Sequence, residues 1–319
     1  SAPSVAPGYQ KVLDADYDKF TLPLYGGFDG VDVMESEPLI NNKILENRTL
    51  TDRKSYEYYT LRKAIDTVSD AEVVDINLLA MPGIYKSEIT DYMISTCENR
   101  ADAMAIVDLR YAYTPRTETT ESAATANNAS SDNKVANVVT EMKSRKINTS
   151  YAAAYYPWVK IRDNYNGANI WVPPSVVALG AMSYGQATQA LWFAPAGFTR
   201  GGLSEGRGGL PVLQVSQRLT KKERDKLYTE CVNPIAQFPA EGIVIWGQKT
   251  MQKTPSALDR INVRRLVIFI KKRVSNIASR LLFGPNVGST WKKFVDQVNP
   301  FLASVQSGLG LQDFKVKLD

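Results

Sequence analysis

The chain has 319 residues, which is enough for about two domains with substantial hydrophobic cores. Apolar residues make up 44% and charged residues 22%, a composition typical of globular proteins, and the net charge is +5. The sequence has no histidine and two cysteines, Cys97 and Cys231, which do not form a C-x-x-C pair. These counts exclude Ser-His-Asp and Cys-His catalytic sites, histidine-ligated metals, cysteine zinc sites and a disulfide framework. The two separate thiols indicate a reducing compartment.

The net charge is unevenly distributed along the chain. Residues 1–199 carry 18 basic and 24 acidic side chains, a net charge of −6. Residues 200–319 carry 20 basic and 9 acidic side chains, a net charge of +11. The change falls at the glycine-rich stretch between Gly201 and Gly209. Because glycines permit tight bends, we predict a boundary there, with domains at 1–204 and 205–319.

The first part alternates predicted helices and apolar strands. The predicted elements in chain order are a helix at 53–68, a strand at 72–81, a helix at 87–100, a strand at 104–109, a helix at 134–146 and strands at 151–156, 159–162 and 169–172. Continuously apolar strands separated by helices indicate an α/β fold with a doubly wound, largely parallel sheet. Residues 114–131 have the polar composition of a loop. Residues 164–199 lack charge, but their prolines and glycines favour a buried segment over a membrane span.

The second part predicts a smaller α+β domain. A polar helix at 221–230 follows the N-cap candidate Thr220, and a short apolar strand is expected at 242–246. A long helix is predicted at 262–283, with Asn262 as N-cap and Gly284-Pro285 as its stop. The remaining predicted elements are a helix at 291–305 and an alternating edge strand at 314–318.

One stretch matches a catalytic motif. Gly202-Leu-Ser204-Glu-Gly206 has the G-x-S-x-G pattern of a nucleophile elbow. An elbow serine needs a base, usually histidine, and no strand is predicted before this stretch. We therefore interpret it as a glycine-rich loop. A hydrolase with a Ser–Lys centre at Ser204 stays open as an alternative, which labelling by a serine-reactive probe would test.

Carboxylates lie near the predicted strand ends, at Asp75, Asp102, Asp108 and Asp163. Paired acids can catalyse proton transfer or hold a metal ion, but no spacing singles out a pair. We interpret these residues as caps and turn residues. The sequence has no P-loop, and no G-x-G-x-x-G lies between a strand and a helix. We therefore expect no nucleotide, cofactor or metal.

The long helix at 262–283 is amphipathic. At 100° per residue, one set of apolar residues falls in an arc about a third of a turn wide, and cations occupy the opposite side without an acid among them. The apolar arc comprises Val263, Leu266, Val267, Ile270, Val274, Ile277 and Leu281. The cations are Arg264, Arg265, Lys271, Lys272, Arg273 and Arg280. This basic face predicts contact with nucleic acid, an anionic membrane or an acidic protein, and the alternative is a merely solvated face.

Several short motifs follow one another in a distinctive order. They are Leu24-Tyr-Gly-Gly-Phe-Asp-Gly30, Pro82-Gly83, Arg100-Ala-Asp-Ala-Met-Ala-Ile-Val-Asp108, Tyr155-Tyr-Pro-Trp-Val-Lys160, Val172-Pro-Pro-Ser175, Trp192-Phe-Ala-Pro-Ala-Gly197, Gly242-Ile-Val-Ile-Trp-Gly-Gln-Lys-Thr250, Ile261-Asn-Val-Arg-Arg-Leu266, Phe283-Gly-Pro-Asn286 before Trp291, and Phe314-Lys-Val-Lys-Leu-Asp319. Each motif alone is weak, but together they span about nine tenths of the chain. In this order they resemble the contractile tail sheath proteins of myoviruses.

The resemblance implies a structural protein of the virion rather than an enzyme. Sheath subunits assemble in the host cytoplasm as a helical homopolymer around the tail tube, and they contract to drive the tube through the host envelope. The expected partners are other sheath subunits, the tube protein, the baseplate and the tail terminator. No small-molecule substrate and no membrane insertion are expected. The cations of helix 262–283 become candidates for docking to the tube or to a neighbouring subunit.

The resemblance also implies a central α/β domain similar to subtilisin without its active site. In the family, terminal arms add strands to sheets of neighbouring subunits. Departures from the family pattern suggest a core fragment that lacks these arms, which we expect to be monomeric in solution. The alternative function from the residues alone is nucleic-acid binding through the basic helix 262–283.

Overall fold

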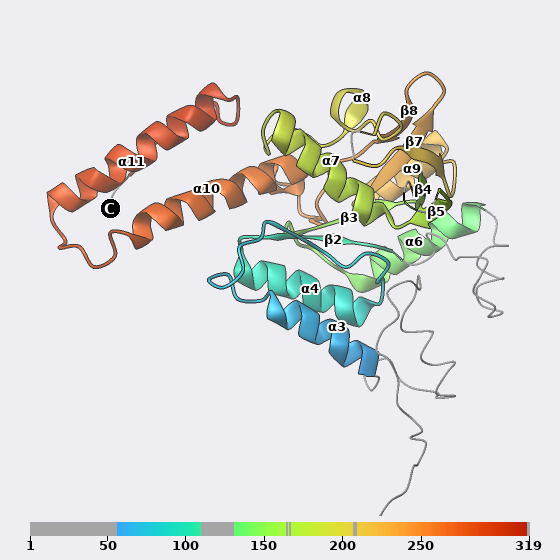
Figure 1. Cartoon of the computed structure of the whole chain (residues 1–319), viewed down its shortest axis with the longest axis horizontal. Helices are drawn as coiled ribbons and strands as arrows, with labels where there is room; N and C mark the ends of the chain where they lie inside the picture. Colours follow the sequence, from blue (N-terminus) through green and yellow to red (C-terminus); the bar gives the residue numbers. More distant parts are fainter. Residues whose placement is uncertain (1–55, 110–130, 164, 166, 207–208, 318–319) are drawn as a thin grey trace, which may run out of the picture.

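The computed structural model describes residues 56–109, 131–163, 165, 167–206 and 209–317. The family-like motif at 24–30 and nearly all of the expected loop at 114–131 lie outside these ranges. The described residues form an α/β body and a long pair of helices that projects from it (Figure 1).

The body is built on a five-stranded sheet. Its strands, in spatial order, are β1 (Leu78–Ala80), β2 (Met104–Val107), β3 (Ala152–Tyr156), β7 (Val232–Phe238) and β8 (Gly242–Ile245). The first four strands are parallel, and β8 returns antiparallel to β7. β2 is buried throughout its length because both faces of the sheet are covered. Because β3 pairs with β7, the sheet continues past the boundary expected near residue 204.

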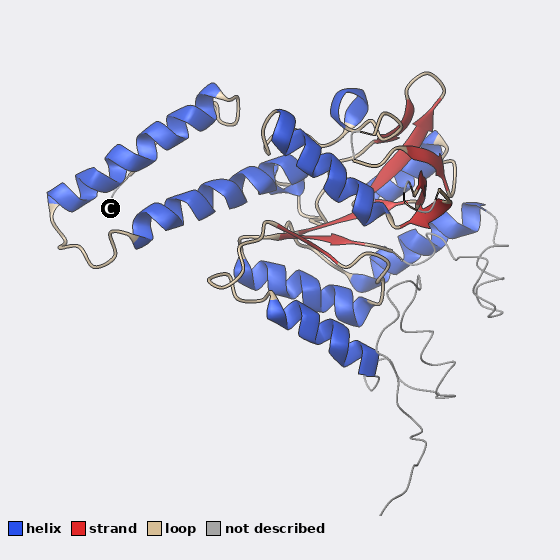
Figure 2. Cartoon of the chain, in the orientation of Figure 1, coloured by secondary structure: helices blue, strands red, loops and turns tan. Residues whose placement is uncertain are grey.

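Helices cover both faces of this sheet (Figure 2). One face packs against four helices, which are α3 (Tyr56–Thr67), α4 (Ser87–Arg100), α6 (Ser131–Arg145) and α9 (Lys221–Thr229). The other face packs against α7 (Pro174–Thr188) and a second, smaller sheet. Side chains of β2 alternate between two cores. Ala105 and Val107 pack on the α3/α4 side of the sheet, whereas Met104 and Ile106 pack on the α7 side. The sheet is therefore doubly wound, as predicted.

The smaller sheet is antiparallel. It has the order β5-β4-β6, with β4 at Val159–Arg162, β5 at Asn169–Val172 and β6 at Val212–Val215. The strand residues Val159, Ile161 and Val212 pack into the same core as α7. The two short helices of the body are α8 (Gly197–Arg200) and the 3₁₀ turn η2 (Ala257–Asp259).

The projecting pair consists of α10 (Ile261–Ser279) and α11 (Gly288–Ser307), which pack against each other (Figure 1). We call it the hairpin. α10 begins inside the body, where Ile261 is fully buried. Three aromatic rings then connect the body to α10 and α11. The ring centres of Trp192 in the body and Phe269 on α10 are 6.1 Å apart, and those of Phe269 and Phe301 on α11 are 5.6 Å apart. Among the described residues, no helix combines the length and apolarity needed to cross a membrane.

Several predicted elements are confirmed by the structure. α4 has the predicted bounds, and the predicted helix before residue 230 forms with a capping box between Thr220 and Glu223. The strand predicted at 72–81 is too long, because residues 72–77 form a turn and an irregular segment. Only β1, at Leu78–Ala80, pairs with a neighbouring strand. β7 is an additional strand that contains Pro234.

Two predictions near the hairpin also need correction. Asn262 is not the N-cap of α10, because its side-chain amide donates to the carbonyl of Trp192, and the cap position is Arg260. α10 ends at Ser279, before the predicted stop. The expected edge strand after residue 313 has no strand partner among the described residues, where 314–317 are irregular. A strand needs a neighbour to satisfy its backbone, and the described residues supply none.

Candidate functional site

The six cations of α10 form three pairs, each two helical turns apart. The pairs are Arg264 with Lys271, Arg265 with Lys272, and Arg273 with Arg280. A spacing of seven residues places the members of a pair on one line, about 10.5 Å apart along the axis. Because α10 begins inside the body, the three lines meet different surroundings.

Arg264 is buried, with 6% of its surface exposed. Its guanidinium lies 4.1 Å from the ring centre of Tyr151 and donates to the hydroxyl of Ser150. Burial lowers the pKa of Arg264. A cation stacked on a ring of its own chain anchors the helix, so Arg264 does not belong to an exposed basic face.

Arg265 and Lys272 face the body rather than solvent. Arg265 is also only 6% exposed, and its Nη2 donates to the side-chain carbonyl of Gln186 over 2.9 Å. Lys272 forms ion pairs with Asp75 and Asp102 and donates to the carbonyl of Ile76. The sequence predicts one exposed face made by all six cations, and this is wrong for Arg264 and Arg265, which are buried. The charge of Lys272 is neutralised by its two aspartate partners.

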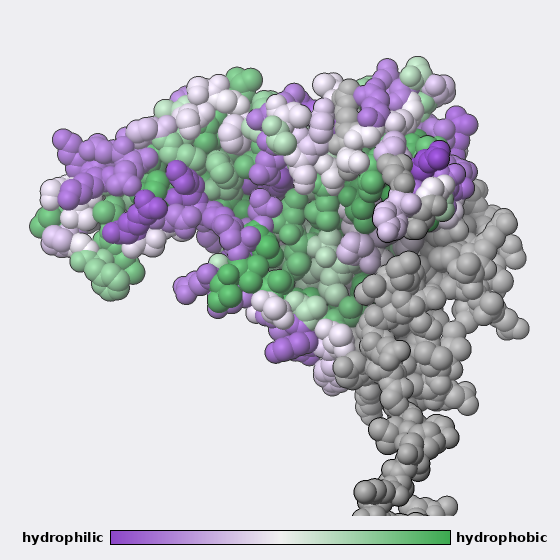
Figure 3. Space-filling model, in the orientation of Figure 1, coloured by the Kyte–Doolittle hydropathy of each residue, from purple (hydrophilic) through white to green (hydrophobic). Residues whose placement is uncertain are grey.

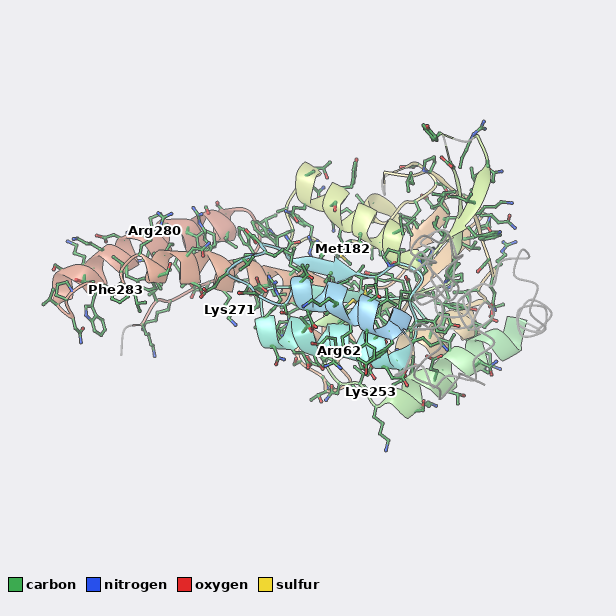
Figure 4. The ribbon with its side chains drawn as sticks, turned by 60° about the horizontal axis from the view of Figure 1, so that its bottom comes forward. Arg62, Met182, Lys253, Lys271, Arg280 and Phe283 are labelled. Atoms are coloured by element: carbon green, nitrogen blue, oxygen red, sulfur yellow. The ribbon has the colours of Figure 1, made fainter. Side chains whose placement is uncertain are left out.

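The remaining cations, Lys271, Arg273 and Arg280, are exposed and form no ion pair with a described residue. Helical geometry places Lys271 about 160–180° around the axis from the other two. Figure 4 shows Lys271 and Arg280 on opposite edges of the hairpin. The exposed charges thus form two separate flanks, and Arg273 with Arg280 make the longer one. We call this pair the arginine flank.

The turn between α10 and α11 exposes apolar side chains. Phe283 is 97% exposed, and its neighbour Leu282 and the following Val287 are also exposed. Apolar surface appears beside charged residues at the far end of the hairpin in Figure 3. Phe283 points away from the hairpin in Figure 4. We call these three residues the apolar tip. An exposed phenylalanine beside cations is typical of a contact surface.

The carboxylates at the strand ends have structural partners. Asp108 at the end of β2 is 1% exposed and accepts from the amide of Gly83 and from the amide and hydroxyl of Ser175, the last over 2.7 Å. It thereby caps the N-terminus of α7. Burial raises its pKa to about 6, and the hydrogen bonds from Ser175 and Gly83 limit the rise.

The other acids are also engaged within the chain. The guanidinium of Arg100 donates to Asp102 over 2.8 Å and also to the backbone carbonyls of Val68 and Val74, which lie between α3 and β1. Asp75 pairs with Lys272, and Asp163 accepts from the amide of Tyr165. The described residues contain no group of three or more histidines, cysteines, aspartates or glutamates placed to hold a metal ion. These acids therefore act as caps and ion-pair partners.

The nucleophile-elbow motif forms a turn rather than a strand-to-helix elbow. Gly202 bridges to Val244, and the hydroxyl of Ser204 accepts from the amide of Ile243 over 2.9 Å. This hydrogen bond ties the glycine-rich loop to β8. Both cysteines are buried, and burial raises the pKa of Cys97 to about 12 and also raises that of Cys231. Neither thiol has the lowered pKa of a nucleophile.

Comparison with known proteins identifies the family. The family model described as phage tail sheath protein central domain matches residues 58–251, which contain both sheets and end just after β8. The chain belongs to the phage tail sheath family. This confirms the resemblance seen in the motifs, and it makes the chain a member of a structural family rather than an enzyme family.

Individual sheath proteins agree with this result. The tail sheath protein of Vibrio phage KVP40 is 35% identical over 173 residues, which cover 54% of this chain and 25% of that protein. The sheath complex of an extracellular contractile injection system, PVC, in the contracted state has a TM-score of 0.58 at 25% identity, covering 79% of this chain and 62% of that one. A chain in the anti-feeding prophage baseplate shares the fold, with a TM-score of 0.58 at 21% identity and coverage of 82% and 61%.

These matches concern part of each relative, since the chain spans a quarter of the length of the KVP40 protein. The matched family and relatives are sheath proteins, so they support the structural interpretation. They give no support to nucleic-acid binding through α10. The range matched by the family model includes Asp108 and its capping contacts and ends before α10.

Proposed function

We propose that the chain is a contractile tail sheath subunit that polymerises around a tail tube and shortens to drive the tube through a host envelope. The family match across the whole five-stranded sheet carries this proposal. The sheath would assemble in the host cytoplasm and remain part of the virion tail. Its partners would be other copies, the tube protein, the baseplate and the tail terminator.

The shape of the molecule suits such a role. The compact body has two well-packed cores, whereas the hairpin projects beyond it and exposes the arginine flank and the apolar tip. We propose that the hairpin docks on an acidic surface of the tail tube. Each exposed ion pair would contribute at most about 1 kcal/mol. Repetition over many subunits would make the attachment stable while each single contact stays easy to release.

The end of the described chain supports strand exchange between subunits. Residues 314–317 alternate apolar and charged side chains, as Phe314-Lys-Val-Lys, yet pair with no described strand. We propose that this segment adds a strand to a sheet of a neighbouring copy, where its backbone groups find partners. Such exchange would keep subunits linked while their bodies slide.

The domain organisation and the finer fold likeness are also proposals. A division into 1–204 and 205–319 would cut the five-stranded sheet between β3 and β7. The family match ends at residue 251, which supports placing the division after β8 and before the hairpin. The doubly wound sheet without a histidine agrees with a subtilisin-like domain that has no catalytic triad.

Charge reversal on the hairpin tests the docking proposal. Arg273→Glu with Arg280→Glu reverses the arginine flank, and Lys271→Glu reverses the opposite flank. The matched control is Lys221→Glu with Lys222→Glu, two exposed cations on α9 of the body. Co-sedimentation with purified tail tubes should fall at least tenfold for the arginine-flank variant and remain unchanged for the control. Equal binding and equal salt sensitivity for all variants would contradict docking through α10.

A further inference from the structure

A cavity of about 210 Å³ lies where the hairpin leaves the body. One wall is a single stripe of α10, formed by Arg265, Ile268, Phe269 and Lys272, which follow one another at helical spacing. The other walls come from the end of α7 and from the chain before β1. The residues of those walls are Gln186, Leu191, Asp75 and Asn77.

The charge in this cavity is incompletely balanced. Lys272 is neutralised by Asp75 and Asp102. Arg265 has five N–H donors, but its hydrogen bond to Gln186 is to a neutral amide, and it has no described carboxylate partner. A guanidinium removed from water without a counter-charge is costly, and burial lowers the pKa of Arg265 accordingly. Arg264 differs, because it is stacked on Tyr151 outside this cavity.

We propose that this cavity binds a carboxylate, with Arg265 as its counter-charge. The guanidinium fork matches a carboxylate in a bidentate arrangement, and the amide of Asn77 offers a further donor at the rim. Ile268, Phe269 and Leu191 provide an apolar lining for a short aliphatic stem. The chemistry therefore fits a glutamate or aspartate side chain, or a free carboxylate of similar size. We call this cavity the Arg265 pocket.

One source of the carboxylate is a second copy of this chain, an assignment that rests on the proposed sheath function. Residues 1–199 carry a net charge of −6, so a neighbouring copy offers many carboxylates. The pocket lies between α10, α7 and the chain before β1, so an occupant contacts the body and the hairpin together. A neighbour bound there would fix the direction in which the hairpin leaves the body. The other source is a free small carboxylate from solution.

The binding chemistry can be tested on the chain itself, without assembly. Propionate serves as the probe, and propionamide is its uncharged control at equal ionic strength. The thermal midpoint of wild-type protein should rise saturably with propionate and not with propionamide. Arg265→Gln, which can keep a hydrogen bond to Gln186, should weaken the apparent affinity at least tenfold. Arg273→Gln, on the exposed flank of the same helix, should respond like wild type.

Two further variants keep the result interpretable. Arg265→Lys retains the charge without the fork and should bind with intermediate affinity. If Arg265→Gln fails to fold, Asn77→Leu at the rim should lower the affinity without removing the buried cation. An unchanged midpoint in propionate for wild type, or an equal response in wild type and Arg265→Gln, would overturn the proposal.

A sedimentation experiment separates the two sources. If a second copy supplies the carboxylate, wild-type protein should associate with rising concentration instead of staying the monomer expected from the sequence. Either propionate or Arg265→Gln should then abolish the association. A chain that stays monomeric while binding propionate assigns the pocket to a free carboxylate. Neither result depends on tube docking, so failure of the sheath proposal, judged by microscopy of assembled tails, would be recognised separately.

Discussion

Lys272 on α10 forms an ion pair with Asp102 immediately before β2, with 3.6 Å between Nζ and Oδ2. The lysine side chain is 25% exposed and the aspartate side chain 15%. The same ammonium also pairs with Asp75 and donates to the carbonyl of Ile76. These contacts join the projecting hairpin to the sheet edge, so the cation that looked like part of a docking face holds α10 in place.

Replacing Lys272 should therefore weaken the fold. Lys272→Gln removes the charge from a partly screened cluster, and we expect it to lower the free energy of unfolding by about 1–2 kcal/mol. The control Lys271→Gln replaces an exposed neighbour that has no described ion pair. This variant should change the free energy of unfolding by less than about 0.5 kcal/mol. Urea unfolding of both variants gives the comparison. Equal losses would mean that the cluster does not stabilise the junction.

Asp108 should give the protein a characteristic pH dependence. Burial raises its pKa to about 6, well above the ordinary value of an aspartate, so the folded state binds the proton more tightly than the unfolded state. Stability should consequently fall as the pH rises from about 4 to about 6 and level off above that, with a total contribution of about 3 kcal/mol.

Asp108→Asn isolates this contribution. Asparagine cannot titrate and presents an amide to Ser175 and Gly83, so the variant should be less stable by about 1–3 kcal/mol at low pH. Subtracting its unfolding free energy from that of wild type at each pH should give a curve that declines between pH 4 and 6. A difference that does not vary with pH would show that Asp108 has an ordinary pKa.

Gly308 lies against the indole of Trp192, whose Nε1 donates to the carbonyl of Gly308 over 2.8 Å. A Cβ at this position would lie 2.8 Å from Cζ2 of that ring. Gly308→Ala should therefore displace the indole and lower the unfolding free energy by about 1–3 kcal/mol. Gly288→Ala at the start of α11 meets no atom within 4 Å and should cause no loss. Differential scanning calorimetry of both variants gives the comparison. Equal melting temperatures would contradict the predicted clash between a side chain at position 308 and Trp192.

The sequence predicted those elements whose signals are local. The capping box of Thr220 and Glu223 and the bounds of α4 follow from residues adjacent in the chain. The sequence predicts no strand at β7, whose Pro234 lacks the amide that a central strand donates. Pro234 is the last β7 residue in the register with β3, and the pairing with β8 begins at Ile235. The strand predicted at 72–81 failed for the opposite reason, since apolar residues such as Val73 lie exposed in a turn.

The candidate site shows the same limit more sharply. A helical wheel places one set of apolar residues of α10 opposite the cations, but it does not show which face of the helix packs into the body. Ile268 is buried on the cation side, whereas Val267 in the apolar arc is 38% exposed. Tyr151 and Gln186, far away in sequence, bury Arg264 and Arg265, and Asp102 neutralises Lys272. Tertiary contacts thus reduce six equivalent cations to three exposed ones and create the Arg265 pocket.

Electron microscopy of the full-length protein assembled with its tail tube tests the central claim most directly. The account predicts striated tubular polymers, with the five-stranded body in the outer layer and the hairpin directed at the tube. The polymers should shorten and widen on triggering while subunits stay linked. Particles that remain globular under assembly conditions, or polymers with the hairpin directed away from the tube, would contradict it.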